Sequence, residues 1–180
     1  MKQTEIEKIA SENFTIRQAK VADIPRIVEI WKQGLAFALG DATIGDKANS
    51  NDQYSFFKKN ILAQNDTFKF WLYINPENQI ISWCSIMPFH PNPLLQDAWG
   101  IMSMYIDEAY QNKMHGYYFS KFVLDNTSNT SIRYILSIVS AQNERVIRLS
   151  IKMGFVTLGT LPHTKEDNQL VNTEMMIYEA

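Results

Sequence analysis

The chain has 180 residues, enough for one compact α/β domain that needs no disulfide bonds. Its 17 basic and 19 acidic residues give a net charge of −2, which provides no basic surface for nucleic acid. No apolar stretch reaches the roughly 20 residues that span a bilayer. Residues 1–13 also lack the continuous apolar segment of a secretory signal. We therefore expect a cytoplasmic protein that binds neither nucleic acid nor a membrane.

The cysteine and the histidines are scattered along the chain. Cys84 is the single cysteine and lies inside the apolar run 80–89, so we expect a buried, unreactive thiol. The three histidines, His90, His115 and His163, do not have the spacing of metal ligands. We therefore expect no metal site.

The N-terminal part of the chain predicts one short strand and two helices. Residues 14–18 alternate between apolar and polar side chains, as a strand does. Residues 21–39 repeat apolar side chains at helical spacing, with Asp23 at the expected N-cap. After a polar segment at 40–51 that favours a loop, residues 53–62 form the second expected helix.

The rest of the chain predicts alternating strands and helices. Residues 75–78 form a turn between two apolar runs, which is typical of a hairpin. The expected strands span 68–74, 79–87, 99–106, 132–140, 155–159 and 174–178, and the expected helices span 114–125 and 144–153. Because no repeat or interdomain linker interrupts this order, it predicts one mixed α/β domain.

Residues 102–117 have the pattern of an anion site. They run from a strand through a short polar turn directly into a helix, so backbone N–H groups and the positive helix end point to one place. Lys113 adds a positive charge, and Gly116 removes a side chain where a ligand would approach. An ordinary strand–helix connection has the same pattern, and this stretch alone leaves both interpretations open.

Two features of the first two thirds of the chain resemble the GNAT superfamily of N-acetyltransferases. The sequence Phe-Thr-Ile-Arg at 14–17, then Ala-Asp-Ile at 22–24 and a long helix, is how these chains usually begin. Their loop motif Q/R-x-x-G-x-G/A, which cradles the coenzyme A pyrophosphate, is similar to Gln111 and Gly116 here. Met114 stands in place of the first glycine of that motif.

Two later features complete the resemblance. A strand ends near Asn143, and the helix that follows closes on Gly154 and Phe155, as in the GNAT superfamily. The resemblance implies an acyl-CoA N-acyltransferase fold, a mixed twisted sheet of about seven strands with helices on both faces. It implies a single domain over residues 14–180, with residues 1–13 as an N-terminal extension.

Three shorter motifs look like the phosphinothricin and methionine-sulfoximine N-acetyltransferase branch. They are Ala-Thr-Ile-Gly at 42–45, Tyr-Ile-Asp at 105–107 and Gly-Thr-Leu-Pro at 159–162. This resemblance implies transfer of an acetyl group from acetyl-CoA, as co-substrate, to a primary amine of a small amino-acid-like molecule. The amine would attack the thioester directly in a ternary complex.

The resemblance also assigns residues to the cofactor. The main chain of Met104, Tyr105 and Ile106 would pair with the pantetheine amides like an added strand. Asn143 would hydrogen-bond the cofactor near its acyl end. The pyrophosphate cradle would be formed by Gln111, Asn112, Lys113, Met114, His115, Gly116 and Tyr117.

The two usual catalytic groups are missing from their expected places. The phosphinothricin branch has a glutamate where this chain has Ile101, and many relatives have a tyrosine where this chain has Ser150. The remaining candidates for the acid and base are Asp97, Tyr105, a water held by strand carbonyls, and Ser150 itself, although a hydroxyl is a poor acid. Ser150 also fits a small helix residue turned toward the sheet.

Other functions and assemblies stay open at this point. A degenerate member of the superfamily could bind acyl-CoA without transferring the acyl group, as a sensor or interaction module. A protein-lysine acetyltransferase would be expected to carry an acidic groove, and the sequence has no concentrated acidic run to build one. The sequence does not decide between a monomer and a homodimer.

Overall fold

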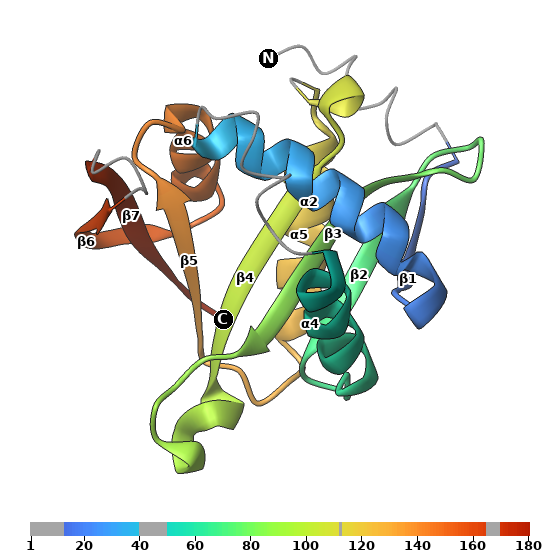
Figure 1. Cartoon of the computed structure of the whole chain (residues 1–180). Coiled ribbons are helices and arrows are strands. Elements are labelled where there is room, and N and C mark those ends of the chain that lie inside the picture. The colour runs from blue at the N-terminus through green and yellow to red at the C-terminus, as the bar shows by residue number, and fades with distance from the viewer. Residues whose placement is uncertain (1–12, 40–49, 112, 165–169) are drawn as a thin grey trace.

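The computed structural model describes residues 13–39, 50–111, 113–164 and 170–180. They form a mixed seven-stranded sheet in the order β1-β2-β3-β4-β5-β7-β6 (Figure 1). The strands are β1 (Thr15–Gln18), β2 (Lys69–Ile74), β3 (Ile80–Pro88), β4 (Trp99–Ile106), β5 (Tyr134–Ser140), β6 (Val156–Thr164) and β7 (Leu170–Glu179). The helices are α2 (Ile24–Leu39), α4 (Ser50–Leu62), α5 (His115–Thr127) and α6 (Glu144–Lys152). This sheet and its helices confirm the predicted fold class.

The structure corrects two predicted boundaries. Residues Val21–Asp23 form a 3-10 turn before α2, so Asp23 is not the N-cap; its Oδ2 instead accepts a hydrogen bond from the Lys20 amide at 2.7 Å. Strands β6 and β7 are longer than predicted because polar residues on an outer hairpin hide the strand pattern. Pro162 is tolerated in β6, an edge strand that pairs only with β7. The predicted segments at 1–13 and 40–51 lie mostly outside the described residues.

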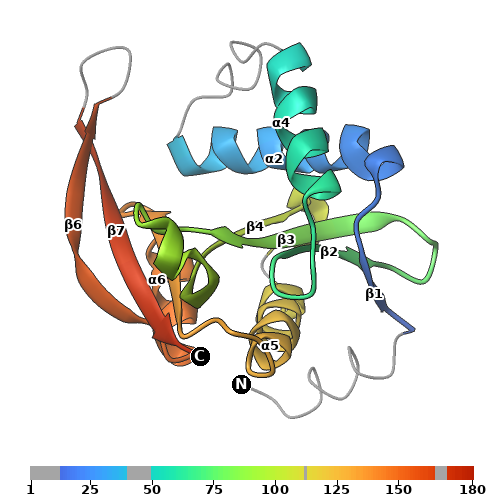
Figure 2. The same ribbon diagram turned by 90° about the horizontal axis from the view of Figure 1, so that it is seen from below.

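Helices cover both faces of the sheet (Figure 2). Helices α2 and α4 pack on one face around apolar side chains that include Ile27, Phe57 and Trp83. Helices α5 and α6 pack on the other face around a second core, to which Phe119 and Ile135 belong. Burial of apolar surface on both faces explains why the central strands read as almost continuous apolar runs.

The sheet comes apart between β4 and β5. These are its two parallel neighbours, and they pair only where Trp99–Ile101 faces Tyr134–Leu136. Strand β4 remains paired with β3 up to Ile106, and β5 remains paired with β7 up to Ser140. Among the described residues, the facing edges of β4 beyond Ile101 and of β5 beyond Leu136 therefore have no partner strand, and the two strands diverge.

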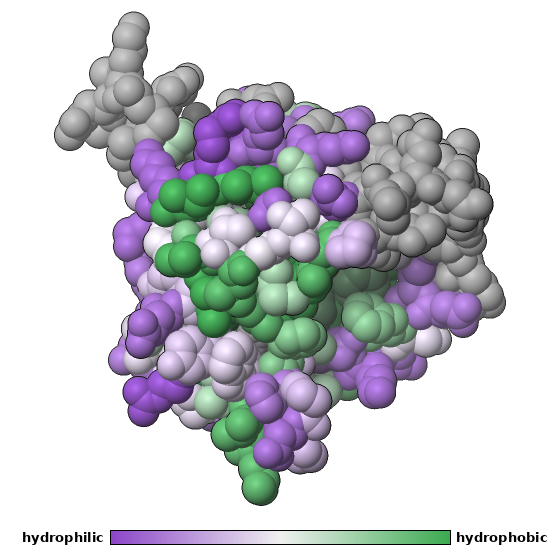
Figure 3. All heavy atoms as spheres, turned by 90° about the vertical axis from the view of Figure 1, so that its left-hand side faces the viewer, coloured by the Kyte–Doolittle hydropathy of each residue, from purple (hydrophilic) through white to green (hydrophobic). Residues whose placement is uncertain are grey.

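The β5–β7–β6 side of the molecule exposes apolar side chains, which Figure 3 shows as green areas. They include Ile138, Val156, Leu158 and Leu161. No helix among the described residues has the length and apolar character needed to cross a membrane.

Candidate active site

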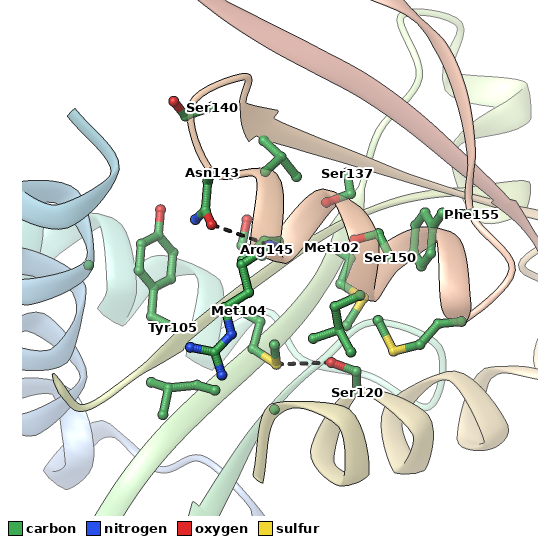
Figure 4. Close-up of a pocket in the computed structure, with 18 of the residues that line it drawn as sticks. Met102, Met104, Tyr105, Ser120, Ser137, Ser140, Asn143, Arg145, Ser150 and Phe155 are labelled. Carbon is green, nitrogen blue, oxygen red and sulfur yellow. Dashed lines mark hydrogen bonds between the residues drawn. The ribbon is translucent and has the colours of Figure 1, made fainter. Parts of the chain in front are cut away.

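A cavity of about 240 Å³ opens where β4 and β5 diverge (Figure 4). One wall is formed by Met102–Ile106 of β4 and by the turn and start of α5. The other wall is formed by residues 137–140 of β5 and by α6. The residues that line the cavity include Gly34, Ser103, Met104, Tyr105, Ile106, Gln111, Lys113, Gly116, Ser137, Asn143, Arg145 and Ser150.

The charges of this lining are all positive. Lys113 and Arg145 reach the cavity from opposite walls, while no aspartate, glutamate or histidine is among the described residues that line it. A cavity with fixed cations and no carboxylates favours an anionic ligand. The unpaired strand edges add backbone amides and carbonyls that can hydrogen-bond an extended ligand.

Tyr105 lies on the β4 wall and faces helix α2. Its ring stacks on Trp83 with centroids 4.9 Å apart. A Cβ placed on Gly34 would lie 2.3 Å from the Tyr105 ring, so only glycine lets α2 come this close. Burial raises the pKa of Tyr105, and a hydrogen bond with the Trp31 side chain opposes this rise only in part. The phenol is therefore neutral near pH 7 and can donate a proton.

The turn after β4 is anchored at both ends. The Asp107 carboxylate forms an ion pair with Arg26 of α2, and it also accepts a hydrogen bond from the Ala109 amide at 2.8 Å. Gln111 Nε2 donates to the Ile106 carbonyl at 3.2 Å. Lys113 Nζ lies 5.2 Å from the centroid of the Tyr110 ring.

Helix α5 begins at this turn with no side-chain cap. Met114 is its N-cap residue and has right-handed helical angles, φ −74° and ψ −2°, so replacing the motif's glycine creates no strain here. The first amides of α5 therefore have no side-chain acceptor at the N-cap, which suits an anionic ligand. At Gly116 an added Cβ would lie 2.9 Å from Ile106 Cδ1, so this glycine also lets α5 pack closely on β4.

The α6 wall contributes side chains. Asn143 caps α6 by accepting a hydrogen bond from the Val146 amide at 3.2 Å, which leaves its amide nitrogen free to donate toward the cavity. Ser150 is buried and lines the cavity, as a small helix residue turned toward the sheet. Ile101 lies at the apex of the opening, at the last paired position of β4 and β5.

Several of the predicted site residues are brought together. Eight of them line the cavity: Met104, Tyr105, Ile106, Gln111, Lys113, Gly116, Asn143 and Ser150. Asn112 lies outside the described residues.

Other predicted residues have side chains away from the cavity. His115 is buried against Phe14, with ring centroids 4.9 Å apart, because aromatic rings from other elements surround it. Tyr117 packs under Lys152, whose Nζ lies 5.1 Å from the ring centroid. Met114, His115 and Tyr117 are not among the residues that line the cavity. Asp97 is exposed on the turn before β4, outside the cavity lining, and it is not a candidate base in this structure.

Sequence reasoning missed other residues of the lining, among them Gly34, Ser137 and Arg145. The first two have no signal in the sequence, because their positions depend on packing between distant elements. Arg145 has one: it occupies the first turn of α6, where the helix dipole disfavours a cation. A basic residue at that position suggests a purpose other than helix stability.

Comparison with known proteins finds similarity to acetyltransferases. No protein-family model matches the chain. The protein YwnH of Bacillus subtilis (strain 168), whose name assigns it to the phosphinothricin acetyltransferases, is 23% identical over 153 residues, covering 85% of this chain and 90% of YwnH.

Two solved structures have the same fold. A GNAT superfamily phosphinothricin acetyltransferase from Sinorhizobium meliloti, in complex with acetyl-CoA, aligns with a TM-score of 0.73 and 18% identity, covering 92% of this chain and 88% of its own. YncA from Salmonella typhimurium, assigned to the acetyltransferases and holding its cofactor acetyl-CoA, aligns with a TM-score of 0.75 and 19% identity, covering 93% and 94%. The chain thus has the GNAT fold and, as its motifs predicted, resembles the N-acetyltransferases of that superfamily, the phosphinothricin branch included.

Proposed function

We propose that this protein transfers an acetyl group from acetyl-CoA to the primary amine of a small, amino-acid-like molecule. The observation that carries the proposal is the cavity between β4 and β5, with two unpaired strand edges and cations on both walls. Acetyl-CoA would present amides to those edges and phosphates to the cations. The similarity to acetyltransferases, two of them solved with acetyl-CoA, supports the same ligand.

The residues that we assign to the ligand are among those that line the cavity. The main chain of β4 from Met104 to Ile106 would bind the pantetheine arm, and Asn143 would donate to it from the other wall. Lys113 and the first amides of α5 would bind the pyrophosphate. An N–H group of the β4 edge would polarise the thioester carbonyl.

In the proposed reaction the amine nitrogen attacks the thioester carbonyl carbon directly in a ternary complex. A C–N bond forms, the C–S bond breaks, the nitrogen loses a proton and the departing sulfur gains one. Tyr105 is the lining side chain whose phenol can donate that proton. The described lining has no carboxylate or imidazole to serve as base, so the neutral fraction of the amine would react, positioned by the two walls.

One observation also favours a second candidate function. The same absence of a base from the described lining fits a protein that binds acyl-CoA without transferring the acyl group. Such a protein would bind acetyl-CoA as well as the enzyme does and would show no amine-dependent release of coenzyme A.

A screen of primary amines and amino acids, followed by thiol release from acetyl-CoA, separates these two functions. Cys84 is fully buried and burial raises the pKa of its thiol, so the protein adds little to the thiol signal. We expect release that depends on one class of small amine and forms its N-acetyl product by mass spectrometry. Tight acetyl-CoA binding without turnover on any amine would instead support the non-catalytic function.

A further inference from the structure

The side chain of Arg145 is directed into the cavity. Figure 4 shows its guanidinium extending from α6 toward Met104 and Tyr105 on the opposite wall, and Arg145 is one of the lining residues. It belongs to the first turn of α6, where the positive end of the helix disfavours a cation. The position therefore weakens the helix slightly while placing a cation in the cleft.

No ion pair in the described part of the chain accounts for Arg145. Its neighbour Glu144 is engaged by Arg148, whose Nη1 lies 2.8 Å from Glu144 Oε2 one turn along the helix. No carboxylate lines the cavity within the described residues. Arg148 and Arg145 thus differ: Arg148 forms an exposed ion pair with Glu144, whereas the guanidinium of Arg145 points into the cavity.

The opposite wall presents the other half of a two-sided anion site. Gln111 and Lys113 line the cavity at the turn before α5, and Gly116 lines it from the first turn of α5, whose first amides have no side-chain acceptor at the N-cap. A ligand group that passes between this turn and Arg145 would meet positive charge on both sides. The planar guanidinium suits phosphate oxygens, which it can bind with two parallel hydrogen bonds.

We propose that Arg145 is a further ligand-binding residue, whose guanidinium closes over the diphosphate of coenzyme A from the α6 side, opposite Lys113. The inference rests on the proposed function, because it takes coenzyme A to be the ligand. It assigns part of the diphosphate binding to a side chain on the second wall. Binding then depends less on the turn in which Met114 stands in place of a glycine.

The test measures dissociation constants by calorimetry for coenzyme A and for dephospho-coenzyme A, which lacks the 3′-phosphate and keeps the diphosphate. The variants are Arg145→Gln, Arg145→Lys and the matched control Arg148→Gln, which removes a cation from the same helix outside the cavity. Each is titrated at low and at high salt, and circular dichroism checks that each is folded.

We expect Arg145→Gln to weaken both ligands by about tenfold or more at low salt, because charge-assisted hydrogen bonds are lost. The loss should shrink at high salt. Arg145→Lys should be intermediate, and Arg148→Gln should change either constant less than about twofold.

Four results would overturn the inference while leaving the proposed function intact. They are loss for coenzyme A alone, which would assign Arg145 to the 3′-phosphate; no loss for either ligand; a loss that high salt does not reduce; and an equal loss in Arg148→Gln. If the unaltered protein binds neither ligand, the proposed function itself is wrong.

Discussion

The two walls of the cleft are built differently. The β4 wall lies in the middle of the sheet with a core on each face, and the turn that extends it is held by Asp107 and Gln111. The β5 wall leads to an outer hairpin that exposes apolar side chains, such as Val156, and its helix α6 bears an exposed ion pair. The first wall offers mainly backbone groups to a ligand, and the second offers mainly side chains.

This difference explains why the binding residues of the two walls are not equally predictable from the sequence. Backbone binding requires a particular shape and tolerates side-chain change, so Met114 can replace a glycine in the turn. Binding by side chains depends on residue identity, so we expect a substitution of Arg145 on α6 to alter what the cleft can bind. We therefore expect the residues that determine ligand specificity to lie on the β5 wall.

The largest expected effect is on the pH dependence of acetyl transfer. This dependence shows whether either wall supplies a general base. The cavity lining that is described has no carboxylate or imidazole, and the raised pKa of Tyr105 keeps its phenol neutral. For an amine with a pKa near 10.4, kcat/KM should rise about tenfold per pH unit, or about a hundredfold between pH 7 and 9. A plateau near pH 7 in stopped-time thiol-release assays would mean that one wall supplies a base.

The next largest effect is on stability and concerns the seam, the short stretch where Trp99–Ile101 of β4 pairs with Tyr134–Leu136 of β5. Gly100 lies in the short β4–β5 pairing, and an added Cβ would lie 2.6 Å from Ile86 Cγ2 in the core. We expect Gly100→Val to lower the free energy of unfolding by about 2–3 kcal/mol, measured by urea denaturation.

Gly159 provides the matched control for the seam. It lies in β6, and a Cβ there would meet nothing within 4 Å. Gly159→Val should change the unfolding free energy by less than about 0.5 kcal/mol. An equal loss of unfolding free energy in Gly100→Val and Gly159→Val would show that close packing at Gly100 is not needed for stability.

A smaller effect on stability is expected from the ion pair between Arg17 and Asp23, on the β4 side of the cleft. Arg17 of β1 donates two hydrogen bonds to Asp23, at 2.8 and 2.7 Å, and this contact holds the pKa of Asp23 below its usual value. Allowing for the solvent that reaches Arg17, Asp23→Asn should lower the unfolding free energy by about 1 kcal/mol at pH 7.

The sign of the pH effect follows from the lowered pKa of Asp23. Its contribution is present above the unfolded value near 3.9 and is lost as pH falls through the lower folded value. The gap between Asp23→Asn and the unaltered protein should therefore narrow as the pH falls below about 3.9, and it should close once the pH lies below the folded pKa of Asp23. Asp125→Asn, which removes the exposed partner of Lys121, should cost less than Asp23→Asn at pH 7. A gap that persists in acid would contradict the ion pair as its cause.

The smallest effect is expected at Ser150 on the second wall. Its hydroxyl is a poor acid, so Ser150→Ala should change kcat/KM by less than about threefold. A true acid–base group is worth about 10²–10⁴-fold. A loss beyond a hundredfold, in protein that still binds acetyl-CoA, would give the serine a role in proton transfer.

The features that could be predicted from the sequence are those set by local signals, and the features that could not are set by tertiary packing. The bounds of β4 and the start of α6 after Asn143 were predictable, because apolar runs and caps are local signals. The burial of His115 was not, since it depends on Phe14 and Tyr73, which are distant from it in the sequence. The approach of Gly34 to Tyr105 likewise depends on how α2 packs on the sheet. Local motifs thus locate the cleft, and tertiary packing decides which side chains enter it.

The central claim is that acetyl-CoA binds in the cleft between β4 and β5, and calorimetry tests it most directly. Two tryptophan variants are titrated beside the unaltered protein. Ser137→Trp fills the cavity from β5, and Thr157→Trp places the same side chain on the exposed strand β6. We predict dissociation constants on the order of micromolar for the unaltered protein and for Thr157→Trp, and a loss of at least about a hundredfold for folded Ser137→Trp. No binding heat from the unaltered protein, or undiminished binding by Ser137→Trp, would contradict the account.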